Sequence, residues 1–160
     1  MGMKYLVDML AMIAIYGVFL YKKWRIKGSD ILLVNTLMYV YIGLVLYVTL
    51  MPIITSIPFI FNHPYAPINL LPFDDYFNGR GDTVRQIVLN IIMMIPFGFL
   101  LPVVKKQNIL SCIARTLMFS LSIELLQPLI NGFRAADITD VITNTVGGVI
   151  GYLLYLFLNQ

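Results

Sequence analysis

The sequence predicts an all-α integral membrane protein, a bundle of about five transmembrane helices. Two observations indicate this class. Hydrophobic residues make up 59% of the chain and charged residues only 12%, whereas a soluble domain carries about 25% charged residues. Five apolar runs are also long enough to cross the hydrocarbon core of a bilayer, which takes about 20 helical residues. At 160 residues, the chain has room for one transmembrane domain, residues 1–160, and for no separate soluble domain.

The first run, Met3–Tyr21, carries Asp8, and we expect Lys4 one turn earlier to be its partner. This run lacks the cleavage site of a signal peptide, so we expect a retained helix. The second run, Ile31–Met51, contains no charged residue. The other three runs fill the second half of the chain: Val84–Val104, Ile109–Ile130 and Ile138–Leu158.

Composition excludes several classes of function. The net charge of +3 is too small, and the hydrophobic content too high, for a nucleic-acid-binding protein. The single cysteine, Cys112, allows no intrachain disulfide. Because His63 is the only histidine, we expect no Cys/His zinc site, and the sequence indicates no cofactor.

Basic residues predict the orientation of the helices, because cytoplasmic connections carry an excess of lysine and arginine. Seven of the eleven basic residues lie in or just after the connections that follow the first and third runs. They are Lys22, Lys23, Arg25, Lys27, Lys105, Lys106 and Arg115. We therefore expect the N-terminus outside and the C-terminus in the cytoplasm.

The connection between the second and third runs, residues 52–83, is rich in proline and aromatic residues. It is too apolar for an aqueous linker and too rich in proline for a straight helix. Under the predicted orientation it is extracytoplasmic. We expect it to lie in the headgroup layer or to fold over the outer end of the bundle.

One face of the last run carries polar and small residues. Asp137, Asp140, Asn144, Gly147 and Gly151 are separated by 3, 4, 3 and 4 residues, which aligns them along a helix. A charged or amide side chain in lipid is costly unless it is paired. A capping role explains Asp137 well and Asp140 partly, and the two glycines favour close helix packing.

Three further polar residues lie at a similar depth. Asn90, Glu124 and Gln127 fall within roughly 10 Å of the predicted outer surface, at about 1.5 Å per helical residue. The inner halves of the last three runs are nearly free of polar side chains. This asymmetry favours a cavity open to the outside over a channel. Arg134 is the natural counter-ion for the carboxylates.

The long loop adds two charged candidates. Asp74 could be a helix cap, a metal ligand or a site carboxylate, and the sequence does not separate these roles. Arg80, between Gly79 and Gly81, is either a solvated loop charge or a group that meets an anion.

Four blocks of sequence together resemble the VanZ-like family in their order and spacing. The blocks are NLLPF at Asn69–Phe73, NIIMMIPFGFLL at Asn90–Leu101, SIELLQ at Ser122–Gln127 and RAADITDVITNTVGGVIG at Arg134–Gly151. The resemblance covers about residues 69–155. The family's founding member is associated with resistance to the glycopeptide teicoplanin. The resemblance therefore implies a multi-pass protein of the bacterial plasma membrane that acts on the cell envelope or its response to such drugs.

Two mechanistic classes fit the polar residues. In the first, which we favour, the cavity binds a membrane lipid, a lipid-linked cell-wall precursor or a lipoglycopeptide. Arginines would then meet phosphate or carboxylate groups. The candidate binding residues are Asp74, Arg80, Asn90, Glu124, Gln127, Arg134, Asp137, Asp140 and Asn144.

In the second class, Glu124 and Asp140 form the acid/base pair of a hydrolase or transferase that acts on an envelope lipid. The sequence offers no serine–histidine or cysteine–histidine pair and no phosphate loop, which leaves a carboxylate-only or metal-assisted enzyme. A third alternative is an accessory subunit whose glycine face docks another membrane protein in a helix-mediated oligomer.

Overall fold

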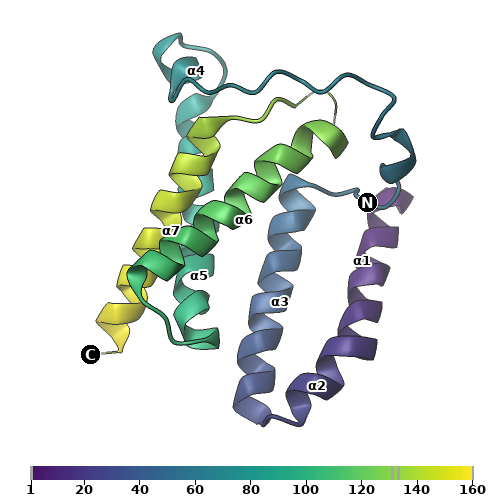
Figure 1. Ribbon diagram of the computed structural model, residues 1–160, viewed down its shortest axis with the longest axis vertical. Coiled ribbons are helices and arrows are strands. Elements are labelled where there is room, and N and C mark those ends of the chain that lie inside the picture. The colour runs from purple at the N-terminus through teal and green to yellow at the C-terminus, as the bar shows by residue number, and fades with distance from the viewer. Residues whose placement is uncertain (1, 131, 133, 160) are drawn as a thin grey trace.

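The computed structural model describes residues 2–130, 132 and 134–159. Within these residues, five helices are long and apolar enough to cross a membrane, which confirms the predicted all-α membrane class. They run alternately up and down (Figure 1). The spans are Met3–Arg25, Ser29–Thr49, Thr83–Val104, Ile109–Ile130 and Ile138–Leu158. Each overlaps its predicted run, and the last two agree with it to the residue.

The first span consists of three consecutive segments: α1 (Met3–Ile15), the π-helical segment η1 (Tyr16–Leu20) and α2 (Tyr21–Arg25). It continues past its predicted end at Tyr21, because Lys and Arg favour helix and their long stems carry the charge toward the headgroups. Gly28, with a φ of 117°, then turns the chain into the next span.

The two ends of the bundle differ in what they carry (Figure 1). The N-terminus lies at the same end as the long loop and the connection between the last two spans. The C-terminus and the two basic connections lie at the other end. The remaining elements are α3 (Ser29–Thr49), the 3₁₀ turn η2 (Ile57–Phe59), α4 (Asp74–Phe77), α5 (Thr83–Val104), α6 (Ile109–Ile130) and α7 (Ile138–Leu158).

Glycines bring α5 and α7 into close contact. A Cβ atom on Gly151 would lie 2.0 Å from the carbonyl oxygen of Ile95, and one on Gly147 would lie 2.2 Å from that of Ile91. No larger side chain fits at either position without moving the backbone. The predicted packing role of these glycines is confirmed. Because α5 of the same chain covers this face, it offers no surface to another protein.

An apolar core fills the bundle between α3, α5, α6 and α7. Phe97 and Phe119 stack with ring centroids 4.7 Å apart. The buried members of the core are Val45, Leu50, Met94, Phe97, Leu101, Cys112, Ile123 and Tyr152. Such a core separates the polar outer part of the bundle from the basic connections at the opposite end.

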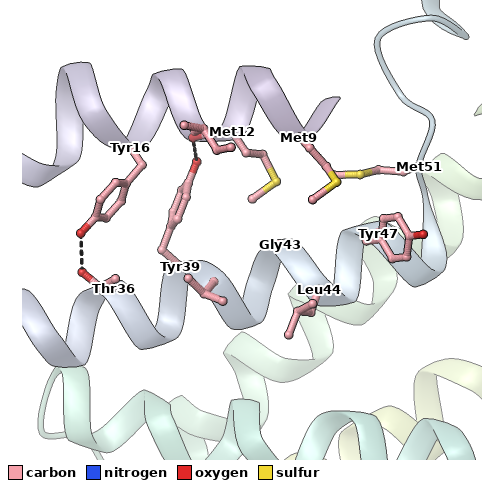
Figure 2. A pocket seen from close by; sticks show the side chains of 11 residues that line it. Met9, Met12, Tyr16, Thr36, Tyr39, Gly43, Leu44, Tyr47 and Met51 are labelled. Carbon is pink, nitrogen blue, oxygen red and sulfur yellow. Dashed lines mark hydrogen bonds between the residues drawn. The ribbon is translucent and has the colours of Figure 1, made fainter. Parts of the chain in front are cut away.

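The first span contacts α3 partly through tyrosine hydroxyls, from Tyr16 in η1 and from Tyr39 in α3 (Figure 2). The Tyr16 hydroxyl is hydrogen-bonded to Thr36 Oγ1 at 2.8 Å, and the Tyr39 hydroxyl donates to the carbonyl oxygen of Met12 at 2.8 Å. An apolar groove of about 490 Å³ runs beside these contacts, over Gly43.

Asp8 does not pair with Lys4, as the sequence led us to expect. Its side chain is only 3% exposed, and its carboxylate accepts hydrogen bonds from the backbone N–H groups of Ile53 at 2.5 Å and Ile54 at 2.9 Å. Two backbone donors that follow a helix end need an acceptor, and Asp8 supplies it. It thereby joins α1 to the start of the long loop.

Candidate functional site

The segment of the long loop at residues 69–73 holds the start of α7. The backbone N–H of Asn69 donates to Ala136 O at 2.8 Å, and the N–H of Ile138 donates to Asn69 O at 3.0 Å. The N–H of Phe73 donates to Thr139 Oγ1 at 2.9 Å. These bonds fix the direction in which the first turns of α7 project their side chains.

Asp137 caps α7 and connects it to α6. Its Oδ1 accepts from the N–H of Thr139 at 2.7 Å, and its Oδ2 accepts from Asn69 Nδ2 at 3.0 Å. Its own N–H donates to Glu124 Oε2 at 3.1 Å. The capping interpretation of Asp137 is therefore confirmed, and the cap also orients the Glu124 carboxylate.

Deeper in the bundle, amides connect α7 to its neighbours. Asn90 Nδ2 donates to Asp140 Oδ1 at 2.7 Å, which joins α5 to α7. Asn144 Nδ2 donates to Ser120 Oγ at 2.8 Å, which joins α7 to α6. The amides of both asparagines are thus already hydrogen-bonded through their N–H groups.

Six predicted site residues line one cavity of about 170 Å³, which we call the inner chamber. It lies between the outer ends of α3, α5, α6 and α7, and its lining includes Asn90, Glu124, Gln127, Arg134, Asp140 and Asn144. Helical spacing and depth were sufficient to predict the convergence of the five residues that lie on helices, and Arg134 reaches the cavity from the connection between α6 and α7.

A larger depression of about 460 Å³, the outer vestibule, adjoins the chamber. It is lined by Asn69, Asp74, Asp75, Arg80, Gln86, Gln127, Arg134, Ala135, Asp137 and Asp140. Gln86, Gln127, Arg134 and Asp140 line both spaces. The remaining predicted residues, Asp74, Arg80 and Asp137, therefore lie at the mouth of the chamber.

The arginines differ from one another in their partners. Arg80 pairs with Asp74 at 2.9 Å and with Asp75 at 3.3 Å. Arg134 forms no ion pair within 4.0 Å among the described residues, contrary to our expectation. Glu124 instead accepts a hydrogen bond from the N–H of Asp137, and Asp140 accepts one from Asn90 Nδ2.

The polar lining is deeply buried. Glu124 and Gln127 are each 4% exposed, and Asn144 is 2% exposed. Gln127 Nε2 donates to the carbonyl oxygen of Thr49 at 3.4 Å. Asn144 Oδ1 has no hydrogen-bond partner in the described part of the chain. A buried acceptor left unsatisfied costs about 1–3 kcal/mol, so this oxygen favours any donor that enters the chamber.

The sequence did not mark three residues as part of this network. Ser120 lies one helical turn before Glu124, so its position on the same face of α6 could have indicated it. Asn69 lies in a block of the family resemblance, but nothing in its spacing predicts a contact with α7. Thr49 contributes a backbone carbonyl, for which the sequence contains no signal. Among the described residues, no group of three or more His, Cys, Asp or Glu side chains could hold a metal ion.

Comparison with known proteins gives a consistent result. The family model described as VanZ/LLP1 matches residues 38–159. Protein VanZ of Enterococcus faecium is 38% identical to this chain over 125 residues, which cover 78% of this chain and 74% of that protein. No solved structure matches. The chain belongs to the VanZ/LLP1 family.

Proposed function

We propose that this member of the VanZ/LLP1 family binds the polar head of a cell-envelope lipid, or of a lipid-anchored glycopeptide antibiotic, in the inner chamber and outer vestibule. The observation that carries the proposal is the unsatisfied Oδ1 of the buried Asn144. It lines the same small cavity as the Glu124 and Asp140 carboxylates. Buried polar groups are normally satisfied, and those that are not are candidates for binding ligands.

The surroundings of the vestibule suit an amphiphile. Several apolar side chains of the long loop are exposed, among them Phe61 at 94%, Phe77 at 78% and Leu70 at 70%. Exposed aromatic and apolar side chains near helix ends are typical of the membrane interface. A lipid could keep its chains against this surface while its head enters the vestibule.

The chamber faces the outside of the cell in this proposal. It lies at the end of the bundle opposite the basic connections, which favour the cytoplasm. In an Asn62→Cys variant, the new thiol should react with an impermeant maleimide in intact cells, while a C-terminal reporter should be active only in the cytoplasm. Reaction only after permeabilisation would reverse the orientation and exclude an outward-facing site.

Binding of a lipoglycopeptide at the membrane surface would lower the amount that reaches cell-wall precursors. This would give the teicoplanin resistance that the family resemblance implies. Cells that express the protein should then survive higher teicoplanin concentrations than cells with an Asn144→Leu variant of equal abundance.

A second candidate function is an intramembrane hydrolase or transferase of an envelope lipid. The observation that favours it is that Glu124 and Asp140 line the same small cavity, as an acid/base pair requires. Incubation of the purified protein with radiolabelled envelope lipids separates the two functions. Saturable binding without product supports the binding function, and product formation supports the enzyme. If the protein neither binds the lipids nor converts them, both functions are rejected.

A further inference from the structure

We propose that the inner chamber selects a ligand whose head carries a primary ammonium group, with Asn144 Oδ1, Glu124 and Asp140 accepting its N–H bonds. This inference rests on the proposed function and names the chemical class of the ligand. The vestibule side of the same ligand would carry an anionic group that meets Arg134.

The first argument is the balance of donors and acceptors. One side-chain N–H of each of Asn90, Gln127 and Asn144 already donates to a protein oxygen. Accepting capacity remains, because among the described residues Glu124 accepts one hydrogen bond, from the Asp137 backbone, and Asp140 accepts one, from Asn90. A carboxylate can accept about four.

The second argument is charge. Glu124, which is 4% exposed, and the half-buried Asp140 bring two carboxylates to this cavity, and buried carboxylates are costly unless a cation compensates them. Arg134 lines the chamber but lies beyond 4.0 Å of both, within the described residues. An ammonium group donates three N–H bonds at a single point, which matches three acceptors that come from two helices, α6 and α7. An anionic head would instead meet two like charges.

The third argument is size. At about 170 Å³, the chamber corresponds to about five to six water molecules at ~30 Å³ each. An aminoethyl arm fits within this volume, whereas a whole phospholipid head with its glycerol is larger. Arg134 lines both spaces, so a phosphate or carboxylate attached to the arm would reach it as the ammonium enters. Phosphatidylethanolamine and an amine-bearing lipoglycopeptide share this chemistry.

The test uses the full-length protein in detergent and three lipids with identical acyl chains. Their headgroups are ethanolamine, choline and glycerol, and each lipid displaces a fluorescent phosphatidylethanolamine. We expect the ethanolamine lipid to bind about tenfold or more tightly than the other two, because choline has charge without N–H donors and glycerol has neither. Equal affinity for the ethanolamine and glycerol lipids would refute the inference and leave the proposed function intact.

A second arm identifies the source of the amine. It compares a lipoglycopeptide that bears free amines with its N-acetylated form. A loss of binding of about tenfold on acetylation supports the same chemistry in an antibiotic, and preference for the ethanolamine lipid alone assigns the site to a phospholipid. If no lipid and no lipoglycopeptide binds saturably, the proposed function fails together with the inference.

Variants at Asn144 locate the selectivity in the chamber. Asn144→Leu removes the unsatisfied acceptor and should abolish the preference for the ethanolamine lipid, while Asn144→Asp keeps an acceptor and should retain it. The matched control is Asn35→Leu, because Asn35 is an intramembrane asparagine that bonds to its own helix at Ile31 O. If Asn144→Leu fails to fold, an Asp140→Asn variant carries the test. Unchanged preference in folded Asn144→Leu, or in folded Asp140→Asn where that variant carries the test, would overturn the inference.

Discussion

The first two spans and the last three are built in different ways. In the most apolar stretch of each of the first two spans, only 6% is buried within the protein, compared with 28%, 28% and 39% in α5, α6 and α7. The helices α5 and α7 touch through backbone and glycine, whereas the first span forms hydrogen bonds with α3 through tyrosine hydroxyls. The buried polar groups of the proposed site lie on α6 and α7, where the backbones are fixed most closely.

The difference shows what a membrane bundle needs in order to hold polar groups. In lipid, helices gain little from burying apolar side chains against one another, so close contact depends on small residues. Polar side chains must be held accurately to satisfy one another, and the glycine contact supplies that accuracy. The family match begins only at residue 38, so α1 lies outside the part that defines the family.

The largest expected effect comes from enlarging a glycine between α5 and α7. Gly151→Leu should abolish folded protein, because even a Cβ atom would lie 2.0 Å from Ile95 O. We expect the free energy of unfolding to fall by more than about 4 kcal/mol. The measurement is the fraction of the protein that is monodisperse after detergent extraction. Gly17→Leu is the control in the first span, since a Cβ atom there meets nothing within 4 Å. Similar yields would remove the contrast between the two regions.

The next effect concerns the carboxylates of the chamber. Glu124→Gln and Asp140→Asn keep shape and part of the hydrogen bonding, so both variants should accumulate normally. Ligand binding should weaken by about tenfold to a hundredfold, the range for hydrogen bonds to charged groups, as measured by lipid displacement. If binding falls only in proportion to folded protein, the carboxylates are structural. Full binding at normal abundance would exclude both from the site.

A smaller effect is expected where the first span meets the long loop. Asp8→Asn leaves one good acceptor for the two backbone N–H groups of Ile53 and Ile54 and should lower stability by about 1–3 kcal/mol. The thermal midpoint in detergent measures this loss. Asp30→Asn is the control, because Asp30 is exposed and its carboxylate accepts only from the adjacent Ser29. Equal midpoints would mean that Asp8 does not secure the loop.

The smallest effect should come from the contact between η1 and α3. Tyr16→Phe removes one hydrogen bond to Thr36, and such bonds within membranes contribute about 0.6 kcal/mol on average. Double-mutant cycles with Thr36→Val measure the coupling between the two side chains. A coupling well above 1 kcal/mol would show that the first span is held as firmly as the bundle.

The sequence was a good guide wherever hydrophobicity or helical spacing carried the information. The bounds of α6 and α7 were predicted to the residue, since polar loops end both apolar runs abruptly. Five of the six chamber residues were predicted to converge because each lies on a helix, where depth follows from position, and Arg134 lies in the connection between α6 and α7. The end of the first span was less accurate, because hydropathy stops before the basic turns of a helix do.

Contacts made by loops and by backbone groups were beyond the sequence. The predicted partner of Asp8, Lys4, was wrong because the Asp8 carboxylate accepts from backbone N–H groups of residues more than 40 positions away. The predicted ion pair of Arg134 was also wrong, because Arg134 lies in the connection between α6 and α7, where helical spacing does not place a side chain. Spacing in a sequence identifies which side chains share a face, but it contains no information on loop trajectories.

The bridge between Asn69 and Asp137 also bears on biosynthesis. The two residues are 68 positions apart, and at about 5–20 residues per second the ribosome needs roughly 3–14 s to make the chain between them. During that time the loop segment is already translated, while the helix start that it must hold does not yet exist. The chamber consequently cannot be complete until the start of α7 has been translated.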